Sequence, residues 1–80
     1  KMSIEKNWIM QENETQINYI RKNGWGLVVI YKVPEVSVIT CKVVGTTYWV
    51  KSSKKGTHNK RCASFYEAVQ EAKRRMEQFD

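Results

Sequence analysis

The chain has 80 residues, of which 41% are hydrophobic and 11% aromatic, and its formal net charge is +6 at pH 7. This length predicts one small domain and excludes a second one, and the apolar content is typical of a globular rather than a disordered protein. No apolar run is long enough to span a membrane, and no signal peptide is recognisable. We therefore expect a cytoplasmic protein, with both cysteines as free thiols.

The N-terminal segment, residues 1–15, fits two structures. Its stretch IEKNWIMQENET is compatible with a short helix or with an edge strand, anchored by Trp8 and Ile9. After it, residues 16–63 have mainly β character, because β-branched and aromatic residues are frequent there.

Asn23-Gly24 predicts the first hairpin of the sheet. Runs rich in Ile, Val and Tyr flank this pair, which is the strongest short-range hairpin signal. The cations Arg21 and Lys22 precede the turn and Trp25 follows it, so the corner is either an ordinary turn or a contact site. For Trp25 we favour a place in the core, because large aromatic side chains are usually buried.

Two further β-branched runs follow, residues 25–33 and 36–44. Pro34 lies between them and is expected to break the strand pairing, because proline cannot donate a hydrogen bond to a neighbouring strand. A second hairpin is expected to turn at Gly45. Either of the two-residue loops that contain this glycine leaves every side chain on the same face of the sheet.

This second hairpin is expected to present two different faces. One face is apolar and would pack on a helix, and the other is basic and polar. The apolar face comprises Ile39, Cys41, Val43, Tyr48 and Val50, and the basic face comprises Thr40, Lys42, Thr47, Trp49 and Lys51.

The last residues, 64–79, predict a helix with its body over 65–78. Ser64 and Glu67 form a capping box at its start, and Arg74 and Arg75 near its end complement the negative pole of the helix. The apolar stripe recurs at three- and four-residue spacing and comprises Phe65, Ala68, Val69, Ala72 and Met76. The fold class is therefore α+β, with a small antiparallel sheet of three to five strands packed against a C-terminal helix.

The positive charge is concentrated in the middle of the chain. Residues 19–61 hold nine of the fourteen Lys and Arg residues and a single acidic residue, Glu35. Such clustering favours a polyanion as partner, and double-stranded DNA is the partner we expect, with sheet residues in the groove and lysines of the 52–59 loop on phosphates. The expected contact residues are Arg21, Lys22, Thr40, Lys42, Trp49, Lys51, Lys54, Lys55, Lys60 and Arg61. A basic but ordinary solvated surface is the competing interpretation.

Signals for catalysis or metal binding are weak. His58 is the only histidine, and no carboxylate pair or nucleophile–base spacing surrounds it in the sequence. Cys41, His58 and Cys62 lack the paired C-x-x-C spacing of a zinc site. We expect no enzymatic activity, no cofactor and no small-molecule substrate.

The stretch YIRKNGWGLVVIY resembles the opening strands of two families, the arm-type DNA-binding domain of lambda-like phage integrases and the plant ethylene-response-factor domain. The matching positions are Tyr19, Arg21, Trp25 and Gly26, and the closing helix SFYEAVQEAKRRMEQF is similar as well. The resemblance implies a three-stranded sheet that is backed by a helix and reads DNA with its outer face, in a phage or mobile-element protein. Residues 34–61 are longer than the connection in these families and are expected to add a strand.

Two other functions fit the same features. A small phage-type protein could bind and modulate a host protein through its sheet or an edge strand. Double-stranded RNA binding is suggested by SSKKG, but in that module the lysines open the helix, whereas this helix is expected to begin at Ser64, about ten residues later.

Overall fold

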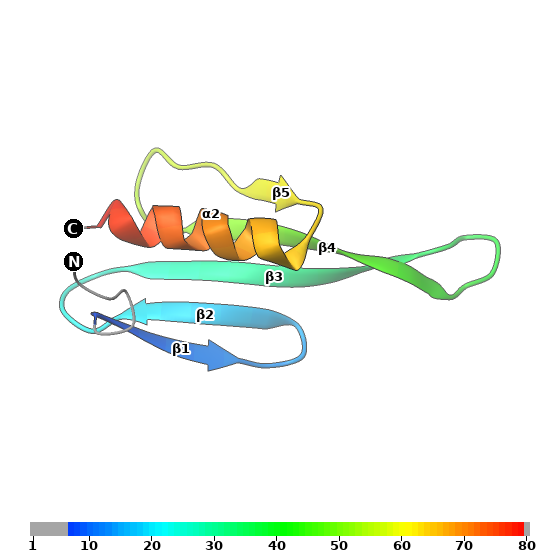
Figure 1. The fold of residues 1–80 in the computed structure, drawn as a ribbon, viewed down its shortest axis with the longest axis horizontal. Coiled ribbons are helices and arrows are strands. Elements are labelled where there is room, and N and C mark those ends of the chain that lie inside the picture. The colour runs from blue at the N-terminus through cyan, green and yellow to red at the C-terminus, as the bar shows by residue number, and fades with distance from the viewer. Residues whose placement is uncertain (1–6, 80) are drawn as a thin grey trace.

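The computed structural model describes residues 7–79, and residues 1–6 and 80 lie outside the described part. Five antiparallel strands form one sheet in the order β1-β2-β3-β4-β5, and one helix packs on it (Figure 1). The elements are β1 (Trp8–Glu12), β2 (Gln16–Arg21), β3 (Leu27–Val36), β4 (Val43–Ser52), β5 (Lys60–Cys62) and α2 (Phe65–Glu77). The predicted α+β class is confirmed, with five strands. No helix within residues 7–79 is long and apolar enough to cross a membrane.

Within the N-terminal segment, residues 8–12 form an edge strand, one of the two structures that the sequence allows. β1 pairs antiparallel with β2, and Trp8 lies opposite Arg21. Trp8 is buried on the helix side of the sheet. Its ring packs edge-on against the ring of Phe79, with 5.4 Å between the ring centroids. Ile9 points to the opposite side and remains exposed. The first six residues of the predicted segment lie outside the described residues.

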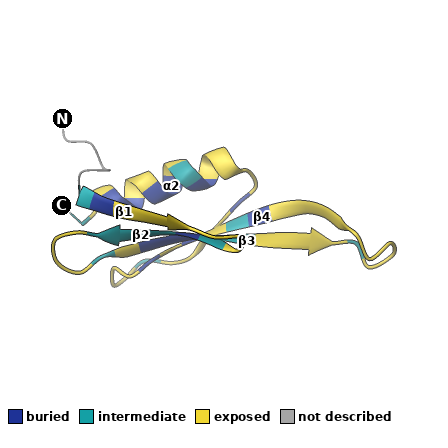
Figure 2. Cartoon of the chain, turned by 90° about the horizontal axis from the view of Figure 1, so that it is seen from below, coloured by how far each residue is buried: buried dark blue, intermediate teal, exposed yellow. Residues whose placement is uncertain are grey.

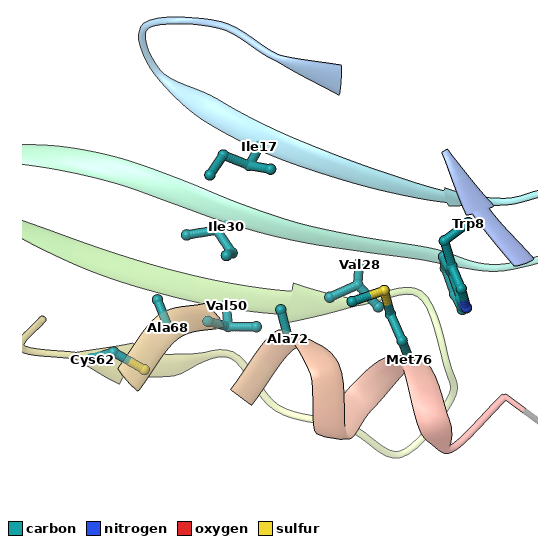
Figure 3. Close-up of a cluster of buried hydrophobic side chains, with 9 residues drawn as sticks. All are labelled: Trp8, Ile17, Val28, Ile30, Val50, Cys62, Ala68, Ala72 and Met76. Carbon is teal, nitrogen blue, oxygen red and sulfur yellow. The ribbon is translucent and has the colours of Figure 1, made fainter. Parts of the chain in front are cut away.

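The core fills the space between α2 and one face of the sheet (Figure 3). The helix contributes small side chains at two of its three contact positions, which lets its backbone approach the strands closely. The buried apolar residues of this cluster are Trp8, Ile17, Val28, Ile30, Val50, Cys62, Ala68, Ala72 and Met76. The predicted stripe is thus confirmed in its central positions, while Phe65 at the first turn stays half exposed.

The predicted cap at the start of α2 is present. The Ser64 Oγ accepts a hydrogen bond from the backbone N–H of Glu67 at 3.1 Å. In return, the Glu67 carboxylate accepts one from the backbone N–H of Ala63 at 3.2 Å. These two bonds satisfy donors that have no partner inside the helix.

Replacing Ser64 with alanine is expected to lower the free energy of unfolding by about 1 kcal/mol, because the Glu67 amide loses its acceptor. Urea denaturation followed by circular dichroism measures this loss. Ser64→Asp is the matched control, since aspartate also caps helices well. An equal loss in both variants would contradict the assigned role of the Ser64 hydroxyl.

The second hairpin differs from the prediction. β3 continues through Pro34 to Val36, the loop occupies residues 37–42, and Gly45 lies inside β4 opposite Glu35. The loop forms around Ser37, whose hydroxyl accepts hydrogen bonds from the amides of Ile39 and Thr40 at 3.3 Å each. A serine that satisfies nearby amides competes with strand formation, even in a β-branched run.

Pro34 does not break the pairing, for a reason visible in the neighbouring backbone. The N–H of Lys32 points to β2, because it donates to the Thr15 carbonyl at 2.8 Å. Position 34 therefore points the same way, and β2 pairs with β3 only as far as Tyr31. The missing proline donor faces an open edge, where it costs no hydrogen bond.

The loop position changes the predicted faces. Ile39, Thr40, Cys41 and Lys42 lie in the exposed loop and belong to neither face, so their assignment to the sheet is wrong. In particular, Cys41 is exposed with a left-handed φ of 56° and is not part of the core. The second half of the prediction is confirmed, because the registers place Tyr48 and Val50 on the helix side and Thr47, Trp49 and Lys51 on the other.

β3 and β4 extend beyond the rest of the sheet as a two-stranded arm, residues 32–47 (Figures 1 and 2). Within the arm the two strands pair only with each other, because β2 ends its pairing at Tyr31 and β5 begins at Tyr48. The molecule is elongated as a result, with extents of 47 × 24 × 20 Å. The arm leaves a row of valine and isoleucine side chains exposed.

Candidate nucleic-acid interface

The ten predicted DNA contacts do not share one surface. The structure distributes them over four places: the tip of the arm, the sheet face opposite α2, the helix side, and one end of the sheet. In that order they are Thr40 and Lys42; Trp49, Lys51 and Arg61; Arg21 and Lys60; and Lys22, Lys54 and Lys55.

The sheet face opposite α2, called the open face below, is mixed rather than basic, with seven apolar or aromatic side chains beside the polar side chains of Gln11, Gln16, Asn18 and Thr47. The strand registers place on it the side chains of Ile9, Ile20, Leu27, Val29, Tyr31, Val33 and Trp49. Lys51 and Arg61 are its only cations among residues 7–79. The predicted basic face is therefore wrong in composition, because Thr40 and Lys42 are in the loop.

Arg61 is moreover engaged within the open face. Its Nη2 lies 3.1 Å from the Glu35 Oε1, and the Thr47 hydroxyl donates a short hydrogen bond to the same oxygen. The hydrogen bonds from Thr47 and Arg61 hold the pKa of the Glu35 carboxyl below its usual value. Lys51 is thus the unpaired cation of this face within the described residues.

Arg21 and Lys60 lie on the helix side of the sheet. The Arg21 guanidinium carbon is 5.9 Å from the centre of the Phe79 ring, a distance at which a cation is attracted to an aromatic face. The Lys60 Nζ lies 3.6 Å from the Glu71 Oε1. Arg21 thus contacts the chain just after α2, and Lys60 contacts α2 itself.

The remaining three lysines lie at one end of the sheet, called the loop end below and made of residues 22–26 and 53–59 (Figure 1). The two loops are neighbours because Leu27 and Ser53 are joined by two hydrogen bonds. The Ser53 N–H donates to the Leu27 carbonyl at 2.9 Å, and the Leu27 N–H donates to the Ser53 hydroxyl at 3.0 Å. Lys22, Lys54 and Lys55 are thereby brought to the same end.

The first loop presents Trp25 to solvent. The hairpin predicted at Asn23-Gly24 is confirmed, with a loop of residues 22–26 that is closed by a hydrogen bond from the Arg21 N–H to the Gly26 carbonyl at 2.9 Å. Gly24 adopts a φ of +86°, which favours glycine. Trp25 is 95% exposed, so the favoured interpretation of this residue as part of the core is wrong.

Gly26 fixes how the chain leaves this loop. A side chain there would place its Cβ 3.0 Å from both the Cβ and the Cδ of Arg21 and 3.2 Å from the ring of Trp8. A larger residue at this position would require the Arg21 or Trp8 side chain to shift by a few tenths of an ångström. The loop therefore passes close to these two side chains.

The second loop is anchored by a buried ion pair on α2. The Arg75 Nε donates to the Glu71 Oε2 at 2.8 Å, with side chains 8% and 7% exposed. The Arg75 Nη2 also donates to the carbonyl of His58 in the loop. Arg75 lies in the last turn of α2, as predicted, and in addition ties the loop to the helix.

Glu71 remains a carboxylate in this setting. Burial favours its neutral form, but the hydrogen bonds from Arg75 and Arg74 outweigh burial and lower the pKa of the Glu71 carboxyl on balance. Sequence analysis did not single out this residue. The spacing of Glu71 and Arg75, four positions apart on one helix, was the available signal.

The lysines of the loop end differ in their local partners. The Lys54 Nζ donates to the Gln78 carbonyl at 2.5 Å, where α2 ends after Glu77. Within residues 7–79, Lys22, Lys54 and Lys55 form no ion pair with a carboxylate. The loop end therefore holds three lysines and one exposed indole at the same end of the sheet, with the Lys54 ammonium bonded to the end of α2.

The three residues considered as zinc ligands are on separate elements. Cys41 lies in the loop at the tip of the arm, His58 in the loop before β5, and Cys62 in β5 under the helix. Burial raises the pKa of the Cys62 thiol. In the part of the chain that the structure describes, no three His, Cys, Asp or Glu residues are placed to hold a metal ion.

The family resemblance rests on residues whose positions are now defined. Tyr19 packs against the core, Arg21 lies over the Phe79 ring, and Trp25 and Gly26 form the exposed turn. No protein-family model, curated protein or solved structure matches this chain. The resemblance to the two DNA-binding families stays a prediction.

Proposed function

We propose that the protein is a non-catalytic DNA-binding protein that contacts DNA through its loop end. Lys22, Lys54 and Lys55 bind phosphates, and Trp25 stacks on a base. The observation that carries this proposal is the 95% exposure of Trp25 at the same end of the sheet as three lysines without carboxylate partners in residues 7–79. The proposal keeps DNA as the partner, moves the contact surface, and replaces the predicted preference for duplex DNA with one for single strands.

The Trp25 indole does not contribute to the stability of the fold, because it is exposed. Burial of a large apolar side chain stabilises a protein by about 1.5–3 kcal/mol, and Trp25 contributes none of this. The sheet holds the turn in place through Gly26 and the pairing of Leu27. A large aromatic ring held outward on an ordered turn beside lysines is the arrangement that binds nucleic acid by stacking.

The open face is the poorer candidate for DNA. Phosphate contacts need free cations, and of the two cations on this face Arg61 is paired with Glu35. Lys51 lies at the border toward the loop end, one residue before Ser52, and extends the cationic surface there.

The geometry favours unpaired bases over duplex DNA. An indole can stack only on a base whose face is free, and the bases inside a duplex are covered on both sides by their neighbours. The lysines contact phosphates of either form. We therefore expect single-stranded DNA to bind more tightly than a duplex of the same length.

Trp25→Ala is expected to weaken binding of a fluorescein-labelled 20-nucleotide single strand by about tenfold, the loss of one stacked base. Fluorescence anisotropy at about 50 mM salt measures the dissociation constant, with duplex DNA and single-stranded RNA as parallel probes. Thermal stability is expected to remain unchanged, because Trp25 makes almost no contact with the folded chain.

Tyr66→Ala is the matched control, because Tyr66 is also a strongly exposed aromatic residue but lies in the first turn of α2. It is expected to leave the affinity unchanged. Equal losses in the two variants, or no loss in Trp25→Ala, would contradict a stacking role. A duplex that binds more tightly than the single strand would contradict the preference for unpaired bases.

A further inference from the structure

The main sheet has one edge that lacks the usual protection against pairing with another chain. β1 is the outermost strand on that side (Figure 1), and its register with β2 is regular from Trp8 to Glu12. Glu12 is the only charged residue of β1. The strand at the opposite edge, β5, has three residues, of which Lys60 and Arg61 are cations. Short strands, lysines, prolines and bulges block edge pairing in natural proteins, and β1 has no lysine, proline or bulge.

The hydrogen bonds that flank β1 show which of its backbone groups are unused. The Lys22 N–H donates to the Asn7 carbonyl at 2.8 Å, and the Asn13 N–H donates to the Gln16 carbonyl at 3.0 Å. Antiparallel strands alternate between levels with and without hydrogen bonds, so the odd-numbered residues of β1 bond to β2 and the even-numbered ones do not. The outward groups are the carbonyl of Trp8 and both backbone groups of Met10 and Glu12. Since β2 is the only neighbour of β1 among the described residues, these groups have no backbone partner there.

The side chains along this edge are mainly apolar. Met10 on the helix side is 57% exposed, and Ile9 on the open face is 46% exposed. Glu12 is paired with Lys32 at 2.6 Å. Residues 8–20 hold no lysine or arginine, although the chain has a net charge of +6. The excess positive charge is therefore not on the edge strand, where it would repel a second basic chain.

We propose that β1 pairs antiparallel with β1 of a second copy of this chain, about a two-fold axis at Met10, so that the two sheets become one. The two Met10 residues then exchange a pair of backbone hydrogen bonds, and the Glu12 N–H of each copy donates to the Trp8 carbonyl of the other. On the helix side the exposed Met10 side chains meet, and on the open face Ile9 lies opposite Gln11. The proposal does not depend on DNA binding.

A second copy suits this edge better than an unrelated extended peptide. A peptide added to β1 would become the new edge of the sheet, with its own unpaired backbone groups. A second copy instead closes the assembly at two chains, and the outer edges of the combined main sheet are then the two β5 strands, which are short and cationic. The two Glu12 residues stay apart, because each lies two positions from the axis and therefore about 13 Å from the other along the strands.

Met10→Pro tests the pairing, with Thr46→Pro as its matched control. Each removes an N–H that bonds to no other strand of the same chain, since Thr46 lies opposite Pro34 in the arm, at a level without bonds between β3 and β4. Proline is tolerated at such edge positions. Sedimentation velocity between about 1 and 200 μM is expected to show a wild-type dimer. Met10→Pro is expected to raise its dissociation constant at least tenfold, because the two central hydrogen bonds are lost, and Thr46→Pro to leave it unchanged.

Hydrogen exchange of the wild-type amides, followed by NMR at about 200 μM, tests the same pairing without a variant. The Met10 and Glu12 amides are expected to be protected, as are those of Ile9 and Gln11, which bond to β2. Unprotected Met10 and Glu12 amides beside protected Ile9 and Gln11 amides would overturn the proposal. So would wild-type protein that stays monomeric up to about 200 μM, or equal dissociation by the two proline variants.

Discussion

Replacing Glu71 with alanine is expected to lower the free energy of unfolding by about 3 kcal/mol, the largest loss among the polar side chains of this protein. The Glu71 carboxylate accepts hydrogen bonds from Arg75 at 2.8 Å and from Arg74 at 2.5 Å. Without it, the Arg75 guanidinium stays buried with no counter-ion. A buried charge that loses its partner is far more costly than a broken surface ion pair.

Two comparison variants separate the ion pair from a general effect of charge. Glu77→Ala removes an exposed carboxylate from the same helix and is expected to change stability by less than about 0.5 kcal/mol. The double variant Glu71→Met with Arg75→Met removes both charges and is expected to recover most of the loss. Equal destabilisation by Glu71→Ala and Glu77→Ala in urea titrations would contradict the role of the pair.

Protonation of the Glu71 carboxylate is expected to lower the stability of the protein at acidic pH. The pKa of Glu71 is lower in the folded chain than its usual value of 4.5. Its stabilising contribution is therefore fully present above pH 4.5 and is lost as the pH falls through the folded-state pKa. Glu71→Ala is expected to show a correspondingly smaller loss of stability on acidification than wild type.

The helix could be predicted from the sequence because its signals are local. Ser64 and Glu67 are three residues apart, and Ala68, Ala72 and Met76 follow one stripe, so no distant contact is needed to place them. The structure bears out both the cap and the stripe. The number of strands could only be bracketed, because β3 and β4 hold recognisable β-branched runs while β1 (WIMQE) and β5 (KRC) do not.

The turn of the second hairpin could not be located from the sequence, because several segments carry residues that are typical of turns. Gly45 is a common turn residue and Pro34 a common strand breaker, yet the chain turns at Ser37–Lys42. Pro34 is tolerated only because β2 is too short to reach it, which is a property of the whole sheet. This displacement moved Thr40, Cys41 and Lys42 off the sheet.

The loop end could be predicted only in part. Its lysines were among the expected contacts, but their meeting with Trp25 depends on the pairing of Leu27 with Ser53. That pairing joins segments far apart in the sequence, and register is set by the packing of the complete sheet. The exposure of Trp25 gave no signal in the sequence, where an aromatic residue that begins a strand after an Asn-Gly turn is usually buried.

The salt dependence of DNA binding tests the loop end most directly. Each phosphate neutralised on a single strand contributes about 0.7 to the slope of log affinity against log salt, so we expect a slope near −2 for three lysines. The double variant Lys54→Glu with Lys55→Glu is expected to weaken binding to all sequences alike and to reduce the slope by between about one and two units.

The matched control is the double variant Lys42→Glu with Lys73→Glu, which makes the same change in net charge at the tip of the arm and on the exposed side of α2. We expect the control to keep nearly the wild-type slope and affinity, while the Lys54 and Lys55 variant loses both. If the two variants lose affinity and slope equally, binding follows net charge rather than the loop end. That result, or the absence of any binding at about 50 mM salt, would contradict the proposed interface.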